Sequence, residues 1–232
     1  MRAHEIVIHR VEQDLVSGRI RVGDRLPSER ALADELGVGR SSVREAMRVL
    51  EAMGVIRTLR GSGPDAGATV IADPATSIGS ALRLHVATRF LPVGDVVETR
   101  VLLETWALRQ ATGSDVDLQN IDAQLDAMDD LDLTPEQFHA MDEHLHVTMS
   151  ALAGNVLVEA MLGSLRDCIR GYMLDAVPLL ENWPAVAVNL RSEHRGIVRA
   201  LRSGDGDLAA NLVRKHIVGF QALTSTPAGR NG

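Results

Sequence analysis

The sequence predicts a mostly α-helical protein with two domains: an N-terminal winged helix-turn-helix, made of three helices and a β-hairpin wing, and a C-terminal all-α helical bundle. Three observations lead to this prediction. Residues 1–54 contain three short helical patterns separated by glycine, residues 55–71 contain two strand-like runs, and residues 75–225 show helical periodicity alone. The length of 232 residues suits two ordinary domains, and a hydrophobic content of 45% lets each bury a core.

Three helices are expected before the wing. The first spans about 3–17, where apolar residues recur at every fourth position and a glycine follows. The second begins after Ser28, a favourable N-cap residue, and ends at Leu36. The third spans about 40–53. It follows the short turn 37–39, and two helices joined by a tight glycine-containing turn are typical of a helix-turn-helix.

The wing follows the third helix directly. Residues 55–59 and 68–71 are rich in β-branched side chains and read as two strands, while the intervening 60–67 is rich in glycine and turn residues. An Asp-Pro step then marks a boundary. We therefore expect a first domain at 1–73 and a second at 74–232.

The second domain is expected to be an all-α bundle, because its apolar periodicity is helical and is broken only by short glycine- or proline-containing segments. The absence of alternating strand patterns disfavours an α/β domain. The candidate helices span about 75–90, 94–112, 115–130, 134–153, 155–179, 184–203 and 205–223.

Composition excludes several classes of protein. No apolar run approaches 18 residues, so no transmembrane helix is expected, and the charged N-terminus does not resemble a signal peptide. A single cysteine, Cys168, cannot form an internal disulfide, which favours a cytoplasmic protein whose metal sites would use histidine and carboxylate ligands. Aromatic residues make up only 3%, too few for the stacking platforms that bind single-stranded nucleic acid.

Basic and acidic residues are distributed unevenly. Residues 1–71 hold 11 Arg against 10 Asp and Glu, whereas the rest of the chain holds 13 basic against 21 acidic residues. Within 40–60 there are five Arg against two Glu. The guanidinium group of arginine can form bidentate hydrogen bonds with phosphate and guanine. This asymmetry therefore favours a small nucleic-acid-binding domain joined to an acidic second domain.

The third helix has the two faces that a recognition helix needs. Its apolar residues lie on one arc, and the neighbouring arc carries arginine and serine (Arg40, Ser41, Arg44 and Arg48). Such side chains at the start of a helix can enter the major groove and bind guanine or phosphate. A solvated arginine face is the alternative interpretation. The preceding helix, the glycine turn and the wing favour DNA binding.

Four residues of the second domain have the spacing of a metal site. Asp142 and His146 lie four residues apart and share a helix face. His194 and His216 are equidistant from residue 205, in a turn between two helices, so an antiparallel pair would place them at the same height. Scattered structural histidines are the alternative, and spacing alone does not distinguish His146 from His139 as the ligand on the same face.

The first domain resembles the winged helix-turn-helix of GntR-type bacterial transcription regulators. The resemblance lies in residues 26–56, LPSERALADELGVGRSSVREAMRVLEAMGVI, above all in LPSER and SSVREA. It implies contacts between double-stranded operator DNA and five residues of the second and third helices (Arg30, Arg40, Ser41, Ser42 and Arg44), and an approach of the wing tip, Arg60 and Gly61, to the minor groove. Gly39 departs from the family, which commonly has Ser or Thr there, so one phosphate contact is in doubt.

The second domain resembles the FCD effector domain of the FadR subfamily of GntR regulators. The matching pieces are Asp142-Glu-His-Leu-His146, Gly154-Asn155, Glu193-His194-Arg195-Gly-Ile197, Gly204-Asp-Gly-Asp207 and His216. The resemblance implies that Asp142, His146, His194 and His216 bind a divalent metal. Three histidines and a carboxylate suit Zn²⁺ best, with Ni²⁺ and Mn²⁺ as alternatives.

The same resemblance implies that Arg100 grips the carboxylate of an effector, with Asn155 and Arg170 as further candidates for its pocket. By spacing alone, Arg100 and Glu104 would be an i,i+4 surface pair. The segments RGSGPDAG and ETRVLLETWA and the region around Trp183 are similar to lactate-responsive members of the family.

The function implied is that of a homodimeric repressor that binds a palindromic operator and is released by a small carboxylic acid such as L-lactate. No catalytic residues are expected. A hydrolase-like enzyme using metal-activated water, and a constitutive DNA-binding protein with a structural metal, are the alternatives. Activation rather than repression stays open.

Overall fold

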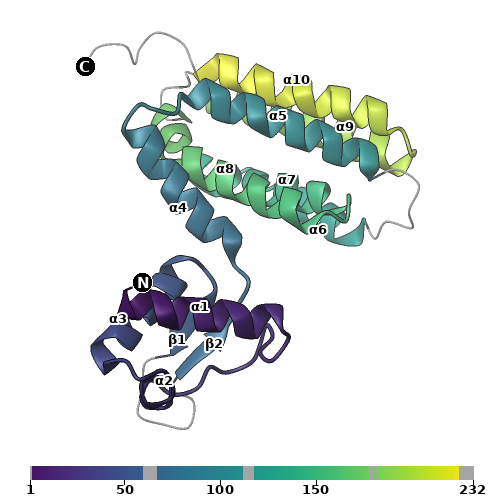
Figure 1. Cartoon of the computed structure of the whole chain (residues 1–232). Coiled ribbons are helices and arrows are strands. Elements are labelled where there is room, and N and C mark those ends of the chain that lie inside the picture. The colour runs from purple at the N-terminus through teal and green to yellow at the C-terminus, as the bar shows by residue number, and fades with distance from the viewer. Residues whose placement is uncertain (1, 60–66, 112–117, 178–179, 181, 225–232) are drawn as a thin grey trace. The chain divides into compact units, whose positions relative to one another are not determined.

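The computed structural model describes residues 2–59, 67–111, 118–177, 180 and 182–224. In this part of the chain it contains ten helices and one two-stranded sheet (Figure 1), which confirms the predicted fold class. Two compact units are present, Met1–Ile78 and Gly79–Gly232. The division falls inside the first helix after the wing and not at the Asp-Pro step. None of the described helices is long and apolar enough to cross a membrane.

The first unit contains three helices and the antiparallel sheet. Their bounds are α1 Ala3–Val16, α2 Glu29–Leu36, α3 Arg40–Ala52, β1 Ile56–Leu59 and β2 Gly67–Val70. All five elements agree with the predicted order. Ile56 pairs with Val70 in the sheet, and both side chains are buried in the core that the three helices share.

The turn between α2 and α3 follows from its residues. The Ser28 hydroxyl accepts a hydrogen bond from the Ala31 amide at 3.2 Å and so caps α2. Gly37 ends α2 with a left-handed φ of 64°, a conformation that glycine adopts without strain. Gly39 occupies the N-cap of α3 and contributes no side-chain hydrogen bond, as its lack of a hydroxyl requires.

The two faces of α3 are those that its periodicity predicts. Its apolar side chains are buried in the core of the first unit (Val43, Ala46, Met47 and Leu50). The arginine and serine positions on the adjacent arc are exposed (Arg40, Ser41, Arg44 and Arg48). The helix is therefore held by its apolar face and presents its cationic face to solvent.

The second unit is the predicted helical bundle, entered through a helix that begins in the first unit. The helices are α4 Pro74–Ala87, α5 Val93–Gln110, α6 Gln119–Ala127, α7 Pro135–Ala151, α8 Val156–Ala176, α9 Trp183–Arg202 and α10 Gly206–Thr224. Each corresponds to one expected helix, with ends that differ by a few residues. The largest difference is at α6, where part of the expected 115–130 lies outside the described residues.

The helices of the bundle pack so that distant parts of the sequence meet. Helix α10 lies beside α5 and α9, and α8 lies beside α7 and α5 (Figure 1). One continuous apolar core fills the space between them, with Phe138, Leu145 and Ile197 among its fully buried side chains. Several charged or polar side chains are nevertheless buried in this core, and they lie on α5, α7, α8, α9 and α10.

Candidate functional site

Four buried or nearly buried side chains meet inside the bundle. Asp142 and His146 come from α7, His194 from α9 and His216 from α10, and each offers one ligand atom within 4.8 Å of the others. Helix α7 starts at a capping box and so has a defined phase, which places Asp142 and His146 one turn apart on its inner face. Antiparallel packing of α9 and α10 brings the other two histidines together.

The Nε2 atoms of all three histidines face one carboxylate oxygen. Asp142 Oδ1 lies 2.9 Å from His194 Nε2, 3.6 Å from His146 Nε2 and 3.7 Å from His216 Nε2. The Nε2 atoms of His194 and His216 are 3.3 Å apart. His146 Nε2 is buried without a hydrogen-bond partner. One divalent ion at the centre of this group would satisfy all of these atoms.

Two glutamates lie behind the histidines and were not singled out as part of the site from the sequence. Glu104 Oε2 lies 2.5 Å from His146 Nδ1, and Glu193 Oε2 lies 2.7 Å from His216 Nδ1. A carboxylate that accepts a hydrogen bond from Nδ1–H leaves the lone pair of Nε2 free for a metal and fixes the orientation of the ring. This pairing is the usual outer shell of a histidine metal site.

The pKa shifts differ among the residues of the site. Burial alone would lower the pKa of His216, but hydrogen bonds to Asp142 and Glu193 raise it. Burial by itself would raise the pKa values of Asp142 and Glu104, but electrostatic attraction to neighbouring basic side chains and hydrogen bonds from histidines outweigh it and hold both pKa values well below their usual range. His146 contributes to both shifts. Burial lowers the pKa of His194 to about 4, so this ring is neutral near pH 7 and able to act as a ligand.

Two buried arginines complete the surroundings of Glu104. Arg100 Nε donates to Glu104 Oε1 at 3.1 Å, and an Arg166 nitrogen donates to the same oxygen at 3.0 Å. Another Arg166 nitrogen lies 3.6 Å from Asp142 Oδ2. The interpretation of Arg100 and Glu104 as a surface pair is wrong, because both side chains are buried. Arg166 was missed, since its only sequence signal is a charge inside the apolar run of α8.

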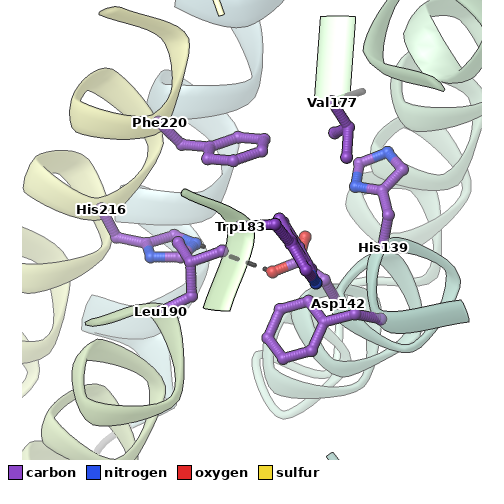
Figure 2. Close-up of a pocket in the computed structure, with 8 residues that line it drawn as sticks. His139, Asp142, Val177, Trp183, Leu190, His216 and Phe220 are labelled. Carbon is purple, nitrogen blue, oxygen red and sulfur yellow. Dashed lines mark ion pairs between the residues drawn. The ribbon is translucent and has the colours of Figure 1, made fainter. Parts of the chain in front are cut away.

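Two adjoining cavities border the group. Figure 2 shows the first, with α10 contributing His216 and Phe220 on one side and α7 contributing His139 and Asp142 on the other. The second is lined by apolar side chains and by Arg100, His139, Asp142, Tyr172 and His216, among others. The space left in it is about 20 Å³, little more than the roughly 10–15 Å³ that one water molecule needs.

The remaining candidates for the second domain are not members of the four-residue group. His139 does not belong to that group. Asn155 caps α8 by accepting hydrogen bonds from the amides of Leu157 and Val158, and it lines neither cavity. Arg170 pairs with Glu143 at 2.9 Å and lines neither cavity either. Of the three predicted effector contacts, only Arg100 lines either of these two cavities.

The candidate DNA-binding residues lie on or before the exposed face of α3. Arg30 of α2 is exposed, and Ser42 is half-buried beside the exposed Ser41. Arg44 reaches from α3 to Glu29 of α2, with 2.8 Å between Nε and Oε2. The predicted contacts of the wing tip, residues 60 and 61, lie outside the described residues.

Comparisons with known proteins agree with this organisation. The family model "Bacterial regulatory proteins, gntR family" matches residues 3–64, and the FCD domain model matches residues 95–219, more than half of the chain. The uncharacterized HTH-type transcriptional regulator YcbG of Bacillus subtilis (strain 168) is 33% identical over 68% of this chain and 65% of its own length.

Two further relatives extend over most of the chain. The putative L-lactate dehydrogenase operon regulatory protein of Escherichia coli (strain K12) is 25% identical over 91% of this chain and 86% of its own. A solved structure, Streptococcus agalactiae GntR, superposes with a TM-score of 0.69 at 22% identity, covering 94% of this chain and 99% of that one. The last comparison supports the fold.

The winged helix-turn-helix and the effector domain together define a ligand-responsive, DNA-binding transcription regulator and not an enzyme. The chain belongs to the GntR family of bacterial regulatory proteins and carries an FCD domain.

Proposed function

We propose that this regulator is a homodimeric repressor that binds a palindromic operator and is released by a small carboxylic acid such as L-lactate. The observation that carries the proposal is the second cavity, where Arg100 and two members of the four-residue group, Asp142 and His216, line one space. A cation site and a guanidinium that face the same cavity can together bind a small anion.

A resident Zn²⁺ fits the donor set. Three imidazole nitrogens and one carboxylate oxygen are typical ligands of zinc, the two glutamates behind them orient the rings, and His146 Nε2 has no other partner. Ni²⁺ and Mn²⁺ accept similar ligands. When bound, the ion would supply a Lewis-acidic position that accepts an anionic oxygen of the effector.

The charges and the size of the cavity favour a small acid. Glu104 engages Nε of Arg100, and the guanidinium also has two terminal amino groups that can donate in parallel to a carboxylate. The space of about 20 Å³ must widen to admit even a three-carbon acid. The regulatory protein of E. coli that this chain resembles carries L-lactate dehydrogenase in its name, which makes L-lactate the first acid to test.

Helix α4 is our proposed route from the effector to the DNA-binding unit. At its start, the Ser77 hydroxyl donates to the Met53 carbonyl at 3.1 Å, within the first unit. Further along, Arg83 pairs with Asp167 of α8. Asp167 follows Arg166, which contacts Asp142 of the metal site. A shift of α8 caused by the effector would therefore act directly on α4.

A close approach of α4 and α8 strengthens this route. A Cβ at Gly79 would lie 3.1 Å from the Ser164 carbonyl oxygen and 2.9 Å from a carboxylate oxygen of Asp167. Glycine thus permits a close contact between α4 and α8. A larger residue at this position would push the two helices apart. A small displacement of α8 would move α4 as well, because the close-packed interface between two helices deforms little.

Dimerisation follows from the way such DNA-binding units work. A single recognition helix reads a short half-site, and two copies related by a two-fold axis read successive major grooves of a palindrome. The protein would act in the cytoplasm, where a bacterium holds its operators.

Gel-shift titration with and without effector tests the proposal. With Zn²⁺-loaded protein, we expect L-lactate to weaken operator binding at least tenfold, and Arg100→Ala to remove this response. Arg109→Ala is the matched control, because Arg109 is exposed on the same helix. Equal operator affinity with and without L-lactate, pyruvate, glycolate and citrate would instead indicate a constitutive DNA-binding protein with a structural metal.

A further inference from the structure

We propose that His139 is a second polar contact of the effector, and that it distinguishes acids with a hydroxyl group on carbon 2 from acids without one. This inference rests on the proposed function, because it assigns a role in the same cavity. His139 lies on α7, one turn before Asp142, and lines both cavities that border the four-residue group. Figure 2 shows it on the same side of the first cavity as Asp142.

The observation that requires an explanation is a buried nitrogen without a partner. His139 is 8% exposed, and its Nε2 makes no hydrogen bond in the described structure. Buried polar atoms are nearly always paired with protein, water or ligand. His139 lines the cavity that Arg100 also lines, so its ring is placed to contact a molecule bound there.

Two competing roles for this nitrogen fail on geometry. His139 does not belong to the group of four residues whose ligand atoms come within 4.8 Å of one another, so it is not part of the candidate metal site. Glu143, one turn further along α7, has its Oε1 3.7 Å from His139 Nε2, beyond hydrogen-bonding distance. The other oxygen of Glu143 accepts a hydrogen bond from Arg170 at 2.9 Å.

Arg100 and His139 are suited to different groups of the ligand. Arg100 is cationic and donates only, which suits a carboxylate. Burial lowers the pKa of His139, so its ring is neutral near pH 7 and offers one donor and one acceptor. A hydroxyl group also donates and accepts, and so matches a neutral imidazole better than a second carboxylate oxygen does.

Both side chains line the same cavity, which must widen to admit the acid. Arg100, Asp142 and His139 line one narrow space, so a three-carbon acid with its carboxylate on Arg100 also lies against His139. A propionate bound in the same way would leave the histidine nitrogen unpaired. Sites that hydrogen-bond a hydroxyl group discriminate against the analogue that lacks it for this reason.

Isothermal titration of Zn²⁺-loaded protein with L-lactate and propionate tests the inference. We expect the wild type to bind L-lactate at least tenfold more tightly than propionate. His139→Leu should bring this ratio close to one by weakening L-lactate alone, and His139→Gln, which keeps a polar group, should retain part of the preference. His144→Leu is the matched control, because His144 is exposed on the same helix. Zinc content and melting temperature should stay at wild-type values.

The possible failures are distinguishable. An unchanged ratio in His139→Leu, with zinc retained, would overturn the role of His139 and leave the proposed function standing. Loss of zinc in both His139 variants would assign His139 to the metal site and also overturn the inference. Wild-type protein that binds neither acid would contradict the proposed effector class, and the role of His139 would fall with it.

Discussion

The two functional regions of this regulator are built in opposite ways. The candidate DNA-reading face of α3 consists of exposed side chains on a single helix, held in place by a separate apolar face. The candidate metal and effector site consists of buried side chains that come from α5, α7, α9 and α10. A surface of the first kind is specified locally, whereas a site of the second kind exists only after the bundle has packed.

The difference has an energetic side. Exposed pairs such as Arg44 and Glu29 contribute about 0–1 kcal/mol to stability, because water screens their charges. Buried groups such as Glu104 and Asp142 must be compensated by neighbouring charges, and removing one partner of such a pair costs about 3–5 kcal/mol. Changes in the candidate DNA-reading face should therefore alter binding without altering stability, and changes that break a buried charge pair of the site should alter both.

The largest effect is expected from the candidate metal ligands. Asp142→Ala removes the oxygen that all three histidines face, so the bound metal should fall from about one ion per chain to none. A ligand present at about 1,000 times its dissociation constant contributes about 4 kcal/mol, and loss of the metal should lower the melting temperature accordingly. Elemental analysis and thermal unfolding in excess Zn²⁺ measure both effects. A variant that still holds one ion per chain would remove Asp142 from the site.

Arg44→Ala is expected to have the next largest effect, confined to DNA. A good bidentate contact between arginine and a base is worth about 1–3 kcal/mol, and the proposed dimer would lose it twice, so specific operator affinity should fall at least tenfold. The melting temperature should not change. Arg202→Ala, at an exposed position of α9, is the control for loss of charge. Unchanged affinity in a gel-shift titration would exclude Arg44 from the interface.

The smallest effect is expected at the contact between α8 and α4. Asp167→Asn weakens the ion pairs with Arg83 and Arg170 and replaces no residue that is predicted to contact the effector. Effector affinity should stay within about twofold of the wild-type value. Allosteric coupling free energies are typically about 1–3 kcal/mol, and we expect the variant to lose part of this coupling, so that L-lactate weakens operator binding less than in the wild type. Asp175→Asn, exposed on the same helix, is the control. A full response in Asp167→Asn would mean that the signal bypasses this pair.

Local patterns predicted the elements well and their ends less well. Glycine, proline and N-cap residues mark the boundaries of α2 and α3, since each acts on the backbone next to it. The contact between His194 and His216 also follows from the sequence, because two helices joined by a short turn pack antiparallel and residues equidistant from the turn meet. The 3.3 Å between their Nε2 atoms agrees with this reasoning.

The partners from non-consecutive helices were decided by tertiary structure alone. His139 and His146 share a face of α7, and only the rotation of α7 against α9 and α10 places His146 in the four-residue group and His139 on the cavity wall. The same packing buries Arg100 and brings Glu104 to His146. Helical periodicity states which residues share a face. The angle and the axial shift at which two distant helices meet depend on how all side chains of the core fit together, and no single segment encodes them.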